Sequence, residues 1–178
     1  MEIVKLSDGL TIELASEEDT RRLGHALAEV VEPGCVIGLI GPLGAGKTRL
    51  VRAVAESLGV DPAAISSPTF VLIHEYEGRL PVYHFDAYRL KTPGAFEDLG
   101  VADYWSSGGV CLVEWADRAR DLLPESVWMI TLTPTGLTSR LAKIALPPGA
   151  EAFARRLAER LERRDSSGVG HGPGSVPY

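Results

Sequence analysis

The sequence predicts a three-layer α/β domain with a mixed, mostly parallel sheet and a late antiparallel strand pair. Two short, continuously apolar runs, 35–40 and 110–115, are typical of strands that are buried on both faces of a parallel sheet. A glycine-rich turn and then a helical pattern follow the first run, as a strand–helix unit of such a sheet requires. Shorter strand-like runs dominate the second half of the chain and predict the antiparallel part.

The amino-terminal segment predicts a hairpin followed by a helix. Residues 3–6 and 10–14 are apolar runs joined by an Asp-Gly turn dipeptide, which favours a small hairpin. Ser16 and Asp19 have the spacing of a capping box, and apolar residues then recur at helical intervals until Pro33 ends the helix.

The next segment predicts a buried strand, a helix and a loop. Residues 35–40 are rich in β-branched side chains, and the apolar residues from Leu50 to Leu58 share one face of the helix that follows. Gly59 supplies the expected helix stop, and residues 60–69 are predicted to form a loop.

Five further runs predict the remaining strands. Residues 70–76 and 82–86 are separated by a link that contains Gly and Pro, and 110–115 is the second fully buried candidate. Residues 127–133 and 140–146 are predicted to form the late antiparallel pair, because Pro-Thr-Gly lies between them and the second run alternates.

Composition divides the chain into three parts. Its 178 residues suit one domain, at roughly 150 residues per domain, and we place that domain at 1–150. Residues 151–164 carry apolar side chains at four-residue intervals with arginines between them, which predicts an amphipathic helix packed on or beside the domain. Residues 165–178 are rich in Gly, Ser and Pro and are expected to form a disordered tail.

Charge and cysteine content exclude several classes of protein. The 18 Lys and Arg residues against 24 Asp and Glu residues give a net charge of −6, which argues against unaided nucleic-acid binding. The two cysteines are too few for a disulfide framework, and no Cys/His cluster has zinc spacing, so we expect a cytoplasmic location. The sequence shows neither a signal-peptide pattern nor an uncharged run near the roughly 18 apolar residues of a spanning helix, so we expect no membrane association.

Residues 41–48, Gly-Pro-Leu-Gly-Ala-Gly-Lys-Thr, match G-x-x-x-x-G-K-[ST], the P-loop pattern. Glycines let the backbone curl so that successive N–H groups face phosphate oxygens, and the following helix adds its positive N-terminal end. Lys47 is expected to reach the β- and γ-phosphates and the Thr48 hydroxyl to ligate Mg²⁺. The pattern therefore predicts a P-loop NTPase-like domain. Its predicted nucleotide-binding residues are Gly41, Leu43, Gly44, Ala45, Gly46, Lys47, Thr48 and Arg49.

A P-loop enzyme also needs an acidic residue at the end of a neighbouring strand, where it holds Mg²⁺ or a water bound to it. Glu114 ends a fully apolar run, and Asp86 ends a more polar one. We predict that Glu114 is a metal ligand and that Asp86 lies in the second shell of the metal or beside the attacking water. A salt bridge to Arg89 or Arg118 is the structural alternative for either carboxylate.

Two residues and one absence bear on the nucleotide. Thr69 lies about twenty residues after the P-loop lysine, where several switch proteins keep a hydroxyl that senses the γ-phosphate; a plain connecting loop is the alternative. Trp115 directly follows Glu114 and faces either an adenine or the core. The chain has neither Asn nor Gln, so it lacks the N-K-x-D segment and the catalytic Gln of small GTPases, which favours ATP.

Six segments in combination point to one known family. They are GPLGAGKT at 41–48, SPTF at 67–70, YHFDAYRL at 83–90, Leu99-Gly100 before Asp103-Tyr104, CLVEW at 111–115 and Leu123-Pro124. The chain resembles the bacterial tRNA threonylcarbamoyladenosine biosynthesis ATPases, the TsaE (YjeE) family, over about residues 10–146. The resemblance implies a Mg²⁺-dependent ATPase required for this tRNA modification, which cycles a threonylcarbamoyl transferase complex of TsaB and TsaD type proteins and meets tRNA through that complex.

The resemblance also implies residue roles. The catalytic residues would be Asp86, Lys47 and Thr69, the metal ligands Thr48 and Glu114, and the further nucleotide contacts Trp115 and Arg140. The chain departs from common family residues at Pro42, Arg49, Ala87 and Ala116. None of these departures removes a phosphate or metal group, so they bear on partner contacts and on rate.

These residues predict in-line attack of water on the γ-phosphate, with Lys47 and the loop amides stabilising the transferred charge. The sequence identifies no arginine finger, so the isolated chain is expected to hydrolyse ATP slowly and to be activated by partner proteins. Two alternatives stay open. A small-molecule P-loop kinase would need an arginine-rich lid, for which Arg118 and Arg120 are candidates, and a non-hydrolysing binding module would use ATP only to order residues 66–70.

Overall fold

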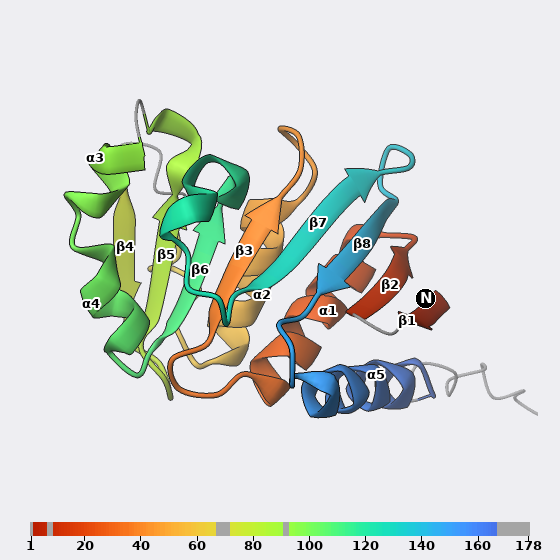
Figure 1. Cartoon of the computed structure of the whole chain (residues 1–178). Coiled ribbons are helices and arrows are strands. Elements are labelled where there is room, and N and C mark those ends of the chain that lie inside the picture. Colours follow the sequence, from red (N-terminus) through yellow and green to blue (C-terminus); the bar gives the residue numbers. More distant parts are fainter. Residues whose placement is uncertain (1, 7–8, 67–71, 91–92, 167–178) are drawn as a thin grey trace, which may run out of the picture.

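The computed structural model describes residues 2–6, 9–66, 72–90 and 93–166. The described residues form one eight-stranded sheet with the strand order β1-β2-β8-β7-β3-β6-β5-β4 (Figure 1). The strands are β1 (Glu2–Leu6), β2 (Gly9–Leu14), β3 (Val36–Ile40), β4 (Ile73–Tyr76), β5 (Val82–Asp86), β6 (Val110–Glu114), β7 (Trp128–Pro134) and β8 (Arg140–Ala145).

The centre of the sheet is parallel and both of its flanks are antiparallel. Strands β7, β3, β6 and β5 run parallel to one another, whereas β4 lies antiparallel at one edge. The late antiparallel pair, β7 and β8, is confirmed. Strand β8 also pairs with β2, so the amino-terminal hairpin extends the same antiparallel flank. The predicted mixed α/β fold is therefore correct, with its parallel part concentrated in the middle.

Helices cover both faces of the sheet and make the three layers (Figure 1). Helices α1 (Glu17–Val30), α2 (Lys47–Ser57) and α5 (Glu151–Ser166) pack on one hydrophobic cluster. On the other face lie η1 (Ala87–Arg89), α3 (Pro93–Glu97), α4 (Val101–Ser106) and η2 (Ala116–Leu122), around a second cluster. Successive side chains of β6 point to opposite faces of the sheet, so Leu112 belongs to the first cluster and Val113 to the second.

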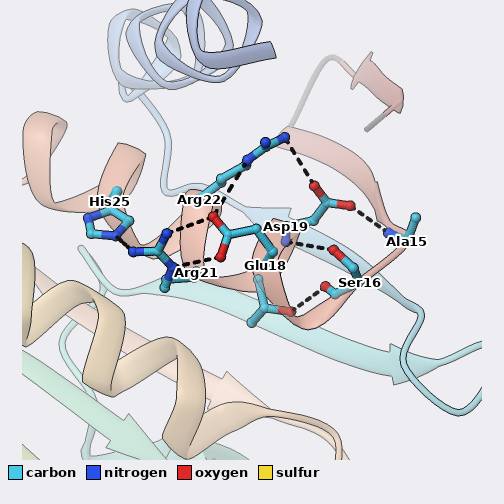
Figure 2. A network of polar contacts seen from close by, with 8 residues as sticks. Ala15, Ser16, Glu18, Asp19, Arg21, Arg22 and His25 are labelled. Atoms are coloured by element: carbon cyan, nitrogen blue, oxygen red, sulfur yellow. Dashed lines mark hydrogen bonds and ion pairs between the residues drawn. The ribbon is translucent and has the colours of Figure 1, made fainter. Parts of the chain in front are cut away.

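The start of α1 has the cap that its sequence predicts (Figure 2). The Ser16 side chain accepts a hydrogen bond from the backbone N–H of Asp19 at 3.1 Å, and the Asp19 carboxylate accepts one from the N–H of Ala15 at 3.0 Å. Further along α1, Gly24 faces Ala53 of α2 so closely that a side chain at Gly24 would overlap the Ala53 methyl group. This close approach fixes α2 against α1 and, with it, the loop that precedes α2.

Some predicted boundaries were wrong. The strand predicted at 70–76 begins at Ile73, because Leu72 lies in a bend, and residues 70 and 71 lie outside the described residues. The strand predicted to include Trp115 ends one residue earlier, because Trp115 has left-handed backbone angles. Helix α5 includes Asp165 and Ser166, which the composition had assigned to the tail. Among the described residues, no helix is both long and apolar enough to cross a membrane.

Candidate active site

The loop between β3 and α2 has the shape of an anion cradle. Gly41 and Gly46 have φ angles of 150° and 102°, which residues with a side chain rarely adopt. A Cβ atom at Gly41 would overlap the carbonyl oxygen of Leu132, and one at Gly46 would overlap the guanidinium of Arg140. Helix α2 begins at Lys47 without a side-chain cap or an acidic residue in its first turn. Its first N–H groups and its positive end therefore remain available to an anion.

Lys47 lies inside this loop. Its Nζ atom donates hydrogen bonds to the carbonyl oxygens of Gly41 at 2.7 Å and Pro42 at 2.9 Å, and it lies 3.7 Å from the centre of the Trp115 ring. Burial lowers the pKa of Lys47 below its ordinary value, and nearby carboxylates, first that of Glu114, act against this shift. The loop thus holds a cation beside the amides that would face phosphate.

A hydroxyl and a carboxylate meet beside this lysine. The Thr48 hydroxyl donates to Oε2 of Glu114 at 2.9 Å, although the two residues are 66 positions apart in the chain. The other carboxylate oxygen, Oε1, lies 2.9 Å from Nε2 of His84. Glu114 is 3% exposed and ends β6, next to Leu39 of β3 and Asp86 of β5 in the strand register. Two hard oxygen donors suit Mg²⁺, so Thr48 and Glu114 fit the predicted metal role.

Asp86 lies at the same edge of the sheet. It ends β5, and its Oδ1 atom accepts a hydrogen bond from the N–H of Tyr88 at 2.9 Å, which caps η1. Asp86 and Glu114 line one cleft of about 460 Å³. The Arg118 guanidinium donates to the Tyr88 carbonyl and lies over the rings of Tyr88 and Trp115.

Trp115 forms one wall of the cleft. Its φ and ψ angles of 57° and 41° are the only left-handed angles of a non-glycine residue in the part of the chain that the structure describes. The ring lies against Lys47 on the loop side and 4.8 Å from the ring of Tyr88. The sequence left an adenine and the core as alternatives for this indole. The structure places it, half-buried, both in the cleft beside the lysine and against the second hydrophobic cluster.

Arg140 and Arg49 also line the cleft. Arg140 opens β8, is 6% exposed, and donates to the carbonyls of Ala45 at 3.4 Å and Thr138 at 2.9 Å. Its Nε atom has no hydrogen-bond partner among the described protein groups. Arg49, in the first turn of α2, forms an ion pair of 2.8 Å with Glu17 at the start of α1.

The structure therefore brings most of the predicted residues together. Those that line the cleft are Leu43, Gly44, Gly46, Lys47, Thr48, Arg49, Asp86, Glu114, Trp115 and Arg140. Gly41 and Ala45 belong to the same loop, whereas Thr69 lies outside the described residues. The sequence assigned no chemical task to two residues at the site: it placed His84 near the nucleotide only through Asp86, and it indicated no role for Tyr88. The alternation of β5 was a usable signal for His84, because it puts His84 on the same face as Asp86.

Comparison with known proteins shows the family of the chain. Residues 14–142 match the model of the family described as threonylcarbamoyl adenosine biosynthesis protein TsaE. The chain is 38% identical over 150 residues to the tRNA threonylcarbamoyladenosine biosynthesis protein TsaE of Bacillus subtilis, covering 84% of this chain and 91% of that protein. It is 42% identical over 117 residues to the protein of the same name from Treponema pallidum, covering 66% and 86%.

A solved structure shows the same arrangement of the chain. The crystal structure of YdiB from Bacillus subtilis superposes with a TM-score of 0.69 at 32% sequence identity, and the match covers 93% of this chain and 99% of that one. The family model spans both the glycine-rich loop and the strand that ends in Glu114. The chain therefore belongs to the TsaE family of threonylcarbamoyl adenosine biosynthesis proteins.

Proposed function

We propose that this protein binds and hydrolyses Mg·ATP and that it serves tRNA threonylcarbamoyladenosine biosynthesis as a partner of TsaB and TsaD type proteins. Membership of the TsaE family supports the pathway. One observation carries the ATPase: the Thr48 hydroxyl, at the end of the P-loop, meets the Glu114 carboxylate, at the end of the adjacent parallel strand, at 2.9 Å. This pairing of loop and strand is what Mg²⁺-dependent nucleotide hydrolysis needs.

Each residue then has a defined task. The loop amides and the start of α2 bind the phosphates, and Lys47 exchanges its carbonyl partners for phosphate oxygens. Thr48 and Glu114 would hold Mg²⁺, which neutralises charge that develops on the transferred oxygens. Asp86, at the same sheet edge, orients the attacking water or accepts its proton. Trp115 shields the lysine from solvent on one side.

The surface around the cleft supports a protein partner. Among the described residues, four large hydrophobic side chains are exposed, and three of them, Leu43, Tyr88 and Leu137, line this cleft. Apolar groups clustered around a polar cleft favour contact with another protein. Arg140 is already bound to two backbone carbonyls, so it does not reach across the cleft as a finger. Because Arg140 does not act as a finger, we expect slow hydrolysis by the isolated chain, and because the rim of the cleft is apolar, we expect a bound partner complex to accelerate it.

Phosphate release tests the proposal. The purified chain is mixed with Mg·ATP, alone and with the TsaB and TsaD type proteins, and Lys47→Ala is compared with Lys143→Ala, which changes an exposed lysine of β8. We expect slow release, acceleration by the partners, and loss only in Lys47→Ala. A kinase would instead transfer the phosphoryl group to a small molecule, at the roughly 1–100 turnovers per second typical of kinases, and would not need the partner proteins. ATP binding without any phosphate release, with partners present, would show a binding module.

A further inference from the structure

We propose that His84 is a positioning residue that orients the Glu114 carboxylate for the metal, an inference that rests on the proposed magnesium site. His84 lies in the middle of β5 and is fully buried. Its Nε2 atom lies 2.9 Å from Oε1 of Glu114, while Oε2 of the same carboxylate accepts the Thr48 hydroxyl at 2.9 Å. Two donors from two different elements therefore fix both oxygens, and with them the direction of the carboxylate plane.

The proposed role requires the ring nitrogen that faces Glu114 to be a donor. A carboxylate that holds a metal only accepts hydrogen bonds, so in this role Nε2 of His84 donates to Oε1. The second ring nitrogen, Nδ1, has no partner among the described protein groups and is shielded from solvent. Within the described residues, Glu114 is thus the one polar group to which the imidazole is hydrogen-bonded.

A core role alone does not explain an imidazole at this position. The strand register pairs His84 with Leu112 of β6 and with His74 of β4, and Val82 lies on the same face of β5. An apolar side chain at this position would suit Leu112 and Val82. A polar group in such a place destabilises the fold unless it forms a hydrogen bond. The hydrogen bond to Glu114 is therefore what accounts for a histidine here. Outer partners of this kind set the orientation and basicity of a metal ligand, and their loss typically lowers metal affinity about 10–100-fold.

Three substitutions separate positioning from packing. The amide nitrogen of Gln reaches the place of Nε2, whereas that of Asn reaches only the place of Nδ1. His84→Gln therefore keeps the donor to Glu114, and His84→Asn loses it while remaining polar. His84→Leu removes the donor and fills the space with an apolar group.

Metal binding is measured directly. Mn²⁺ is titrated, with electron paramagnetic resonance of the free ion as the readout, into each variant saturated with a non-hydrolysable ATP analogue. The affinity for the same analogue in excess EDTA is measured by calorimetry. We expect His84→Asn and His84→Leu to lose about 10–100-fold in Mn²⁺ affinity, and His84→Gln to recover most of it. The metal-free affinity for the analogue should be the same in all four proteins.

The outcomes that contradict the inference are distinct. Unchanged Mn²⁺ affinity in His84→Asn, or equal losses in His84→Gln and His84→Asn, would overturn it. A parallel fall in metal-free affinity would show that His84 only supports the fold. If His84→Leu fails to fold, the Gln and Asn variants still decide. A wild-type chain that binds the analogue equally well with and without metal would refute the proposed magnesium site itself, whatever the histidine variants do.

Discussion

Replacing Gly46 by alanine should damage the P-loop in two separable ways. Gly46 is the N-cap of α2, with φ 102° and ψ 14°, so any side chain there is strained by its own backbone. The new Cβ would also overlap Nη1 of Arg140 and lie only 3.5 Å from its Cζ and 3.7 Å from its Cδ. Because Arg140 is buried and bonded to Ala45 and Thr138, its guanidinium cannot simply swing away.

The strain of the backbone and the overlap with Arg140 each lower the free energy of unfolding. Left-handed backbone angles with a Cβ cost about 1–2 kcal/mol. Overpacking against a held side chain costs about 1–3 kcal/mol more. Gly44 provides the matched control, since its φ of 79° is also left-handed but a Cβ atom added there would have no neighbouring atom within 4 Å. Gly44→Ala should therefore lower the free energy of unfolding by the first amount only, and Gly46→Ala by the sum.

A double-mutant cycle assigns the difference to Arg140. The free energy of unfolding is measured by chemical denaturation, followed by circular dichroism, for Gly46→Ala, Arg140→Ala and the double variant. The double variant should be more stable than additivity predicts, by about 1–3 kcal/mol, because the overlap is gone. Equal losses in Gly44→Ala and Gly46→Ala, or strict additivity in the cycle, would refute the close packing of Arg140 on the loop.

Three further predictions concern the rest of the fold. Ser16→Ala should lower the free energy of unfolding by about 0.5–2 kcal/mol, whereas Ser16→Gly should cost only a few tenths; equal effects would exclude a capping role. Gly24→Ala should be destabilising by about 1–3 kcal/mol despite its gain in helix propensity, and Ala53→Gly should recover only part of the loss, because backbone atoms of Ala53 and Val54 would still lie 3.1–3.2 Å from the new Cβ; a stabilised Gly24→Ala would contradict the tight α1–α2 contact. Burial raises the pKa of Cys35 and Cys111 from 9.0 to about 12, so at pH 8 a thiol reagent should modify the folded chain about 1,000-fold more slowly than the unfolded one. The thiols ionise near pH 9 in the unfolded chain and near pH 12 in the folded chain. Their burial in the neutral form therefore contributes fully to the free energy of unfolding below pH 9, and this contribution is lost as the pH rises toward 12. Rapid labelling of the folded chain would refute the burial of the thiols.

Local signals in the sequence predicted the elements that carry the loop. The glycine spacing, the apolar run before it and the helical pattern after it all act within one short stretch of chain, and all three elements are present. The segment from Ala87 to Gly109 shows the opposite case. Its short helices have too few turns for a periodic pattern, and they form around Phe96, which meets Phe85 at 5.7 Å between ring centres. Tertiary packing determines these helices, so local pattern could not predict them.

The sequence predicted that Thr48 and Glu114 belong to one site, but not that their side chains touch. A carboxylate at the end of a buried parallel strand was expected near the loop because such strand ends meet at one sheet edge, and the register of Leu39 with Glu114 has this form. The place of His84 depends on the pairing of β5 with β6, and that of Arg140 on the pairing of β7 with β8. Strand order is a property of the whole chain, and no local sequence signal encodes it.

The junction between the parallel and antiparallel parts of the sheet explains why cations and carboxylates meet here. Parallel strands have their carboxyl ends at one edge of the sheet, so the glycine-rich loop after β3 and Glu114 at the end of β6 lie together at that edge. An antiparallel hairpin returns to that same edge, so β8 starts where β7 ends, and Pro134 pairs with Arg140. An arginine at the first position of β8 therefore lies beside a loop that is almost a hundred residues earlier in the chain. In a wholly parallel sheet the next strand would start at the opposite edge, and the second buried cation, Arg140, would be absent from the loop side of the cleft.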